Sequence, residues 1–146
     1  MKIGDADIDE FGATMPKAAT VEDFEQALQF AAWALQGSPW WIGDLLNEAE
    51  RRFGDGYAQS VPDSLSLSKV NRLRSTSAKV AKALRKPNTG LSQGHYDTAA
   101  RLPANFQEEF LTKAINEGWG TNEFRDLVSV FLRTQKDKAL RERGDV

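Results

Sequence analysis

The chain has 146 residues, of which 40% are hydrophobic and 27% charged, and its formal net charge is −2. These values are typical of one compact soluble domain. No apolar run approaches the roughly 20 residues of a membrane-spanning helix. The chain has no cysteine, which excludes disulfides and thiolate metal sites. The N-terminus lacks the basic-then-apolar layout of a signal peptide, so we expect a cytoplasmic protein.

Charge is strongly segregated along this nearly neutral chain. Residues 1–50 hold ten acidic and two basic residues, a net charge of −8. Residues 51–101 hold three acidic and ten basic residues, a net charge of +7, and residues 102–146 carry −1. A positive segment of this kind favours binding to nucleic acid although the whole chain is acidic. A solvated helix face is the alternative, but such faces usually mix both signs of charge.

The first fifty residues predict an arm and two helices. Residues 1–19 have glycine, proline and scattered acids without periodicity, which indicates a flexible arm. A helix is expected from Thr20 to about Gln36, with Gly37 as its stop, and another from Pro39 to about Phe53. We expect both apolar stripes to be buried, and the paired tryptophans at 40–41 to belong to the core. The first stripe consists of Val21, Phe24, Leu28, Ala31 and Leu35.

The stretch from Ser64 to Lys86 is the most informative of the chain. It contains seven basic residues and no acidic one. A short helix over residues 54–61 precedes it, then a tight turn, and then a cationic amphipathic helix expected over about 66–82. This order is the layout of a helix-turn-helix. One side of the basic helix is apolar. The other side carries Ser68, Asn71, Arg72, Ser75, Lys79 and Lys82, which suits a DNA major groove.

Three further helices are expected, over about 92–102, 103–117 and 121–133, followed by a charged tail over 134–146. No window alternates apolar and polar residues for long enough to predict a strand. The sequence therefore predicts an all-α protein of about six or seven helices, with a single DNA-binding domain over residues 20–133. Ser92 is the expected cap of the first of these helices, whose free amides could hold a phosphate.

The motifs of enzymes are missing. The chain has no glycine-rich phosphate loop, no HExxH and no GxSxG motif. A single histidine, His95, cannot build a metal site or a triad by itself, so a structural role or a phosphate contact is expected of it. We therefore predict no catalytic residue, no metal and no cofactor.

Three segments together resemble a known family. They are WWIGDLLN at 40–47 with FGDGYAQ at 53–59, LSQGH at 91–95 with AARLP at 99–103, and EGW at 117–119 with NEFR at 122–125. In this order and spacing they are similar to the LmbU-like regulators of actinobacterial antibiotic clusters and to related phage and mobile-element proteins. The second and third segments also resemble the helix-turn-helix half of ParB and KorB partition proteins. The resemblance covers residues 38–130.

The resemblance implies an all-helical, sequence-specific binder of double-stranded DNA that acts in transcription control. It places the recognition helix at about 66–82 and implies backbone contacts from the LSQGH helix start. Asn71 and Arg72 are the candidates for base edges, because Asn pairs with adenine and Arg with guanine. The remaining predicted DNA-binding residues are Ser66, Ser68, Lys69, Arg74, Ser75, Lys79, Lys82, Ser92, Gln93 and His95.

The sequence also leads to an expectation about oligomeric state and to an alternative function. A single domain reads few base pairs, so we expect a homodimer on a two-fold site. The alternative function is a small helical protein-binding module, such as a phage or mobile-element inhibitor of a host protein. In that case the acidic residues 1–50 would form the interaction face.

Overall fold

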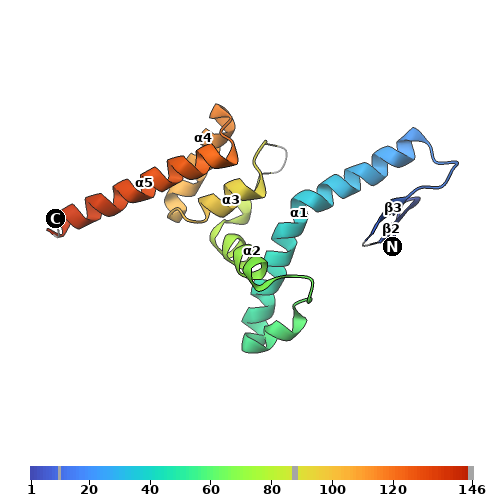
Figure 1. Cartoon of the computed structure of the whole chain (residues 1–146), viewed down its shortest axis with the longest axis horizontal. Coiled ribbons are helices and arrows are strands. Elements are labelled where there is room, and N and C mark those ends of the chain that lie inside the picture. The colour runs from blue at the N-terminus through green and yellow to red at the C-terminus, as the bar shows by residue number, and fades with distance from the viewer. Residues whose placement is uncertain (10, 87–88, 145–146) are drawn as a thin grey trace. The chain divides into compact units, whose positions relative to one another are not determined.

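The protein is predominantly helical, as predicted, with one small sheet (Figure 1). The computed structural model describes residues 1–9, 11–86 and 89–144. By its internal contacts the chain divides into two compact units, Met1–Pro39 and Trp40–Val146. Helix α1, Val21–Phe53, contributes residues to both units. None of the described helices is long and apolar enough to cross a membrane.

The first unit contains a sheet that the sequence did not predict. Strands β1 (Lys2–Ile3), β2 (Ala6–Asp9) and β3 (Gly12–Thr14) pair antiparallel in that order. In register, Ile3 lies opposite Ala6, and Ile8 opposite Ala13. Each strand has only two to four residues, which is too short for an alternating pattern to be recognised. The predicted arm therefore contains regular structure.

Helix α1 is continuous where two helices were expected. Gly37 is not among the glycines with positive φ, so it does not form the left-handed stop that was predicted. Pro39 lies inside the helix, where it removes one backbone hydrogen bond. The expected end near Phe53 is confirmed, because the next residue, Gly54, has φ +56° and begins the 3₁₀ helix η1, Gly54–Ser60.

The apolar stripe at the start of α1 is exposed, although we expected it to be buried. Val21 is 70% exposed, Leu28 66% and Leu35 77%. Phe24 is 48% exposed. The sequence pattern correctly indicates an amphipathic helix but does not say what covers the apolar side.

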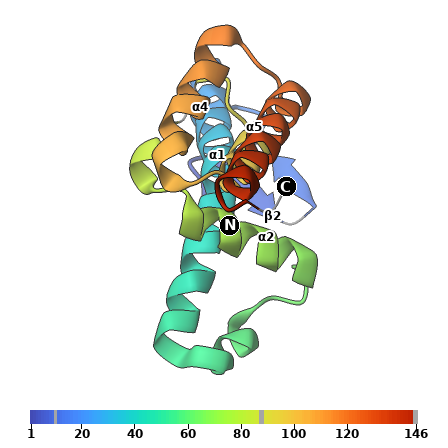
Figure 2. The same ribbon diagram turned by 90° about the vertical axis from the view of Figure 1, so that its left-hand side faces the viewer.

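The second unit is built from α2 (Leu67–Lys79), η2 (Lys82–Leu84), α3 (Gln93–Ala99), α4 (Ala104–Glu117) and α5 (Thr121–Glu142). Figure 2 shows α4 and α5 beside each other and α2 crossing the C-terminal part of α1. Phe124, Val128, Leu111 and Val80 are among the buried residues of one core that joins α3, α4 and α5. Helix α5 continues to Glu142, so the predicted tail is helical up to that residue.

Helix α2 is shorter than the predicted helix over 66–82. Ser66 is its N-cap and accepts a hydrogen bond from the backbone N–H of Lys69. The helix stops at Lys79 because Val80 turns into an extended conformation and is completely buried in the core. Lys82 therefore lies on η2 and not on the basic helix.

Candidate nucleic-acid interface

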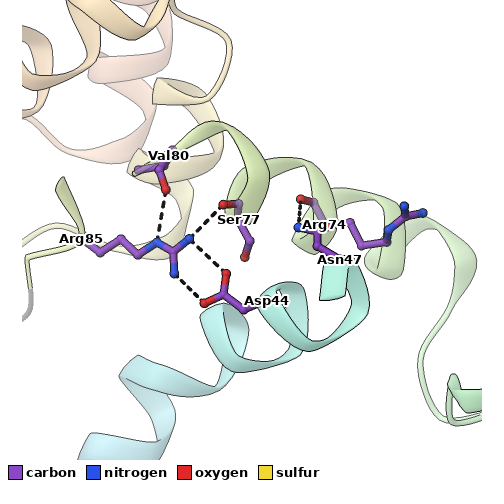
Figure 3. Close-up of polar contacts among 6 residues, drawn as sticks. All are labelled: Asp44, Asn47, Arg74, Ser77, Val80 and Arg85. Carbon is purple, nitrogen blue, oxygen red and sulfur yellow. Dashed lines mark hydrogen bonds and ion pairs between the residues drawn. The ribbon is translucent and has the colours of Figure 1, made fainter. Parts of the chain in front are cut away.

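Helix α2 is held against the C-terminal part of α1 by a close helix crossing. A Cβ atom built on Gly43 would collide with the Ser77 side chain and lie 2.5 Å from the carbonyl oxygen of Leu73. Only glycine permits this approach. The Asn47 side-chain amide donates to the Arg74 carbonyl oxygen at 3.0 Å (Figure 3). These contacts determine which side of α2 is buried.

Arg85 fixes the other end of the crossing. Its guanidinium binds both carboxylate oxygens of Asp44, at 2.8 and 3.1 Å, and donates to the carbonyl oxygens of Ser77 and Val80 (Figure 3). It also lies 4.2 Å from the ring centre of Trp40. With 11% of its side chain exposed, Arg85 is a structural residue of this unit. Trp40 packs against the core, as expected. Trp41 is 40% exposed, so the expectation that both tryptophans belong to the core is wrong for Trp41.

The opposite side of α2 is exposed along its length. Val70, Leu73, Thr76 and Ser77 are buried, and they occupy the side that contacts α1 and α3. Almost all residues that were predicted to contact DNA from this side of α2 are accessible to solvent. We define the α2 face as Ser68, Asn71, Arg72, Ser75 and Lys79, of which all are exposed except the half-buried Ser75.

The α2 face contains no acidic residue, and basic residues surround it. Lys69 and Lys82 are exposed beside it. One acidic residue of another helix contacts the face: the Asp97 carboxylate of α3 lies 3.9 Å from the Arg72 guanidinium. Asp97 also accepts a hydrogen bond from the buried Thr76 hydroxyl at 2.7 Å. Nothing in the sequence indicated that Asp97 would lie beside Arg72, because the two residues belong to different helices.

Arg74 does not belong to this face, although it was predicted to bind phosphate. Its side chain is only 20% exposed and forms an ion pair with Glu50. It also donates a hydrogen bond to the Tyr57 hydroxyl at 2.7 Å. Arg74 lies on the side of the helix that faces α1 and η1, so we leave it out of the interface.

His95 is buried and structural. Its Nδ1 atom accepts a hydrogen bond from the Ser92 backbone N–H at 3.0 Å, and Nε2 lies 2.8 Å from the Trp119 carbonyl oxygen. A neutral ring with its hydrogen on Nε2 satisfies both contacts. Because both nitrogens have partners inside the protein, we also leave His95 out of the interface. The predicted cap at Ser92 is confirmed as a capping box with His95.

The remaining predicted residues are peripheral. Ser66 is exposed, but its hydroxyl caps α2. Ser92 is exposed and Gln93 half-buried, at the start of a helix of only seven residues. The Gln93 amide donates to Asp97 at 3.4 Å. These three residues stay predictions at the edge of the α2 face.

The arginines at the end of α1 are neutralised within their own helix. Glu48 accepts hydrogen bonds from Arg51 and Arg52 at 2.6 to 2.8 Å. These hydrogen bonds lower the pKa of the Glu48 carboxyl to about 2. Arg51 and Arg52 therefore add little to the positive field of the second unit. Over residues 1–9, 11–86 and 89–144, no group of three or more His, Asp or Glu residues is placed to hold a metal ion.

Comparisons with protein-family models, with curated proteins and with solved structures find no match to this chain.

Proposed function

We propose that the protein binds double-stranded DNA through the α2 face and acts as a sequence-specific regulator of transcription. The C-terminal part of α1, η1 and α2 would form the helix-turn-helix. The observation that carries this proposal is the exposure of the α2 face together with its composition. It has short polar side chains, two cations and no acid, on a helix whose other side is fixed by the Gly43 crossing.

The dimensions and chemistry of the α2 face suit a major groove. Helix α2 has 13 residues and is therefore about 20 Å long, which is enough to cross the groove. Asn71 and Arg72 lie on its exposed side and would reach base edges. Lys69, Lys79 and Lys82 would neutralise phosphates on either side. The resemblance of the sequence segments to LmbU-like and ParB-type proteins implies the same role for this helix.

Salt dependence of binding tests the proposal. The interface would contain four exposed cations, Arg72, Lys69, Lys79 and Lys82. For each copy of the protein we therefore expect a slope of log K against log salt concentration of about −3 to −4. A fourfold rise in salt concentration should then lower the affinity roughly 100-fold. The measurement is fluorescence anisotropy of a labelled random duplex over a salt series. If the protein fails to bind duplex even at the lowest salt, the proposal is wrong.

The alternative function is a protein-binding module that uses the acidic N-terminal part. The exposed apolar residues of α1 next to Glu22 and Glu25 favour it. In that case the protein would bind no duplex, and charge changes on the α2 face would have no effect on the partner. The salt series distinguishes the two functions.

A further inference from the structure

The N-terminal part of α1 exposes an apolar stripe with a regular spacing. We define the α1 seam as Val21, Phe24, Leu28, Ala31 and Leu35, which follow one another at intervals of three and four residues. All five are exposed. Another side of the same helix is half-buried, at Asp23, Ala27, Phe30 and Ala34.

The spacing of the seam suits a second helix. Alternating intervals of three and four residues are the a and d positions of a heptad repeat, which pack against another helix with the same repeat. The neighbouring positions 27, 32 and 34 are alanines. These small side chains allow two helices to approach closely and offer no charge with which to select a foreign partner. A second copy of the chain supplies a matching stripe by symmetry.

The distribution of charge determines the direction of pairing. No charged residue occurs from Gln26 to Gly43, whereas Glu22, Asp23 and Glu25 lie in the first turns of the helix. A parallel pair would bring six carboxylates together at one end. An antiparallel pair places the acidic end of each helix beside the uncharged end of the other, which avoids this repulsion.

We propose that the α1 seam is the surface of a homodimer in which two α1 helices pair antiparallel. The 15 residues from Val21 to Leu35 span about 22 Å. Such a short helix pair buries less than the roughly 1,600 Å² of a standard interface. The dimer is therefore reversible and dissociates at micromolar concentrations. This proposal is independent of DNA binding by the α2 face.

Single cysteines test both the surface and the direction, because the natural chain has none. Phe24→Cys and Leu35→Cys are oxidised separately and as a mixture, without DNA. An antiparallel pair forms a disulfide between the two variants in the mixture and little in either alone, because like positions lie about 16 Å apart along the axis. Efficient cross-linking of each variant with itself would overturn the antiparallel arrangement.

Sedimentation equilibrium of the uncross-linked protein provides the second measurement. The natural chain should change from monomer to dimer between micromolar and millimolar concentrations. Leu28→Glu should abolish the dimer with an unchanged circular dichroism spectrum, whereas Gln26→Glu, with the same added charge on the opposite side of α1, should preserve it. A natural chain that stays monomeric throughout, or a dimer that survives Leu28→Glu, would overturn the proposal.

Discussion

Gly43 determines how closely α1 and α2 approach. Its lack of a side chain allows the Leu73 carbonyl oxygen and the Ser77 side chain to occupy the space of a Cβ. We expect Gly43→Ala to lower the free energy of unfolding by about 1–3 kcal/mol, because the two helices must separate to admit the methyl group. Urea unfolding measures the change.

Gly56→Ala is the matched control for this substitution. A Cβ at Gly56 would meet only the Phe53 Cβ, at 3.9 Å, so its effect should be within about 0.5 kcal/mol. Equal changes in the free energy of unfolding for the two substitutions would contradict the close approach of α1 and α2 at Gly43.

Tyr96 gives the stability of the second unit a dependence on alkaline pH. Its hydroxyl accepts a hydrogen bond from the Lys86 N–H at 2.8 Å and donates to the Lys86 carbonyl oxygen at 3.1 Å. Burial raises the pKa of the Tyr96 phenol above its usual value of 10.0, although the bond to the Lys86 backbone opposes this. The unfolded chain therefore loses the proton first, so stability is lost as pH rises above about 10.

The variant Tyr96→Phe tests this dependence. Below that pH the natural chain should be more stable than the variant by about 1 kcal/mol, because it keeps the two hydrogen bonds. The advantage should stay constant below pH about 9 and shrink as the pH rises above about 10, as followed by urea unfolding at each pH from about 8 to about 11. A constant difference between the two proteins over this range would contradict the assignment.

At the level of single residues, the sequence predicted which side chains lie on the exposed side of α2 better than it predicted their contacts with distant residues. It placed Asn71, Arg72 and Lys79 on one exposed side of a helix, because the 3.6-residue period separates that side from Val70 and Leu73. It could not indicate that Arg74 would turn to Glu50, since ion pairs between distant residues leave no periodic signal. The contact between His95 Nε2 and the Trp119 carbonyl oxygen could not be predicted for the same reason.

At the scale of elements, α2 should read bases with Asn71 and Arg72. We expect Asn71→Ala and Arg72→Ala each to cost about 1–3 kcal/mol on the preferred duplex and to relax the preference at one base position. Selection of bound sites from a random duplex pool gives the preference of the natural chain and of each variant.

Lys79→Ala is the comparison for these two variants. It should weaken binding to all duplexes alike and leave the selected sequence unchanged, because a phosphate contact carries no sequence information. An Arg72→Ala variant that selects the same sites as the natural chain would show that Arg72 does not contact a base.

The presence of the helices could be predicted more reliably than the residues at which they end. The capping box at Ser92 and the left-handed glycines at 54 and 118 have clear local signals, and these boundaries are correct. The end of α2 at Lys79 has no such signal, because it depends on the burial of Val80 in a core made by distant helices. The small sheet was missed because its strands are very short.

At the scale of the whole molecule, the segregation of charge favours one DNA-binding region in an acidic protein. The net charge of +7 over residues 51–101 includes cations that the fold uses internally, such as Arg74 and Arg85. Four of the cations left exposed, Lys69, Arg72, Lys79 and Lys82, lie on α2 and η2. The acidic residues 1–50 should not contact DNA, because like charges repel.

A pair of charge-reversed variants tests whether the α2 face binds DNA. Lys69→Glu with Lys79→Glu changes the α2 face, and Lys136→Glu with Lys138→Glu makes the same change in net charge on α5. All four lysines are exposed, so both variants should fold. Duplex binding is measured by anisotropy at one salt concentration. We expect a loss of affinity of about 100-fold or more for the α2 variant and only a few-fold loss for the α5 variant. Equal losses in the two variants, or none in either, would contradict DNA binding through the α2 face.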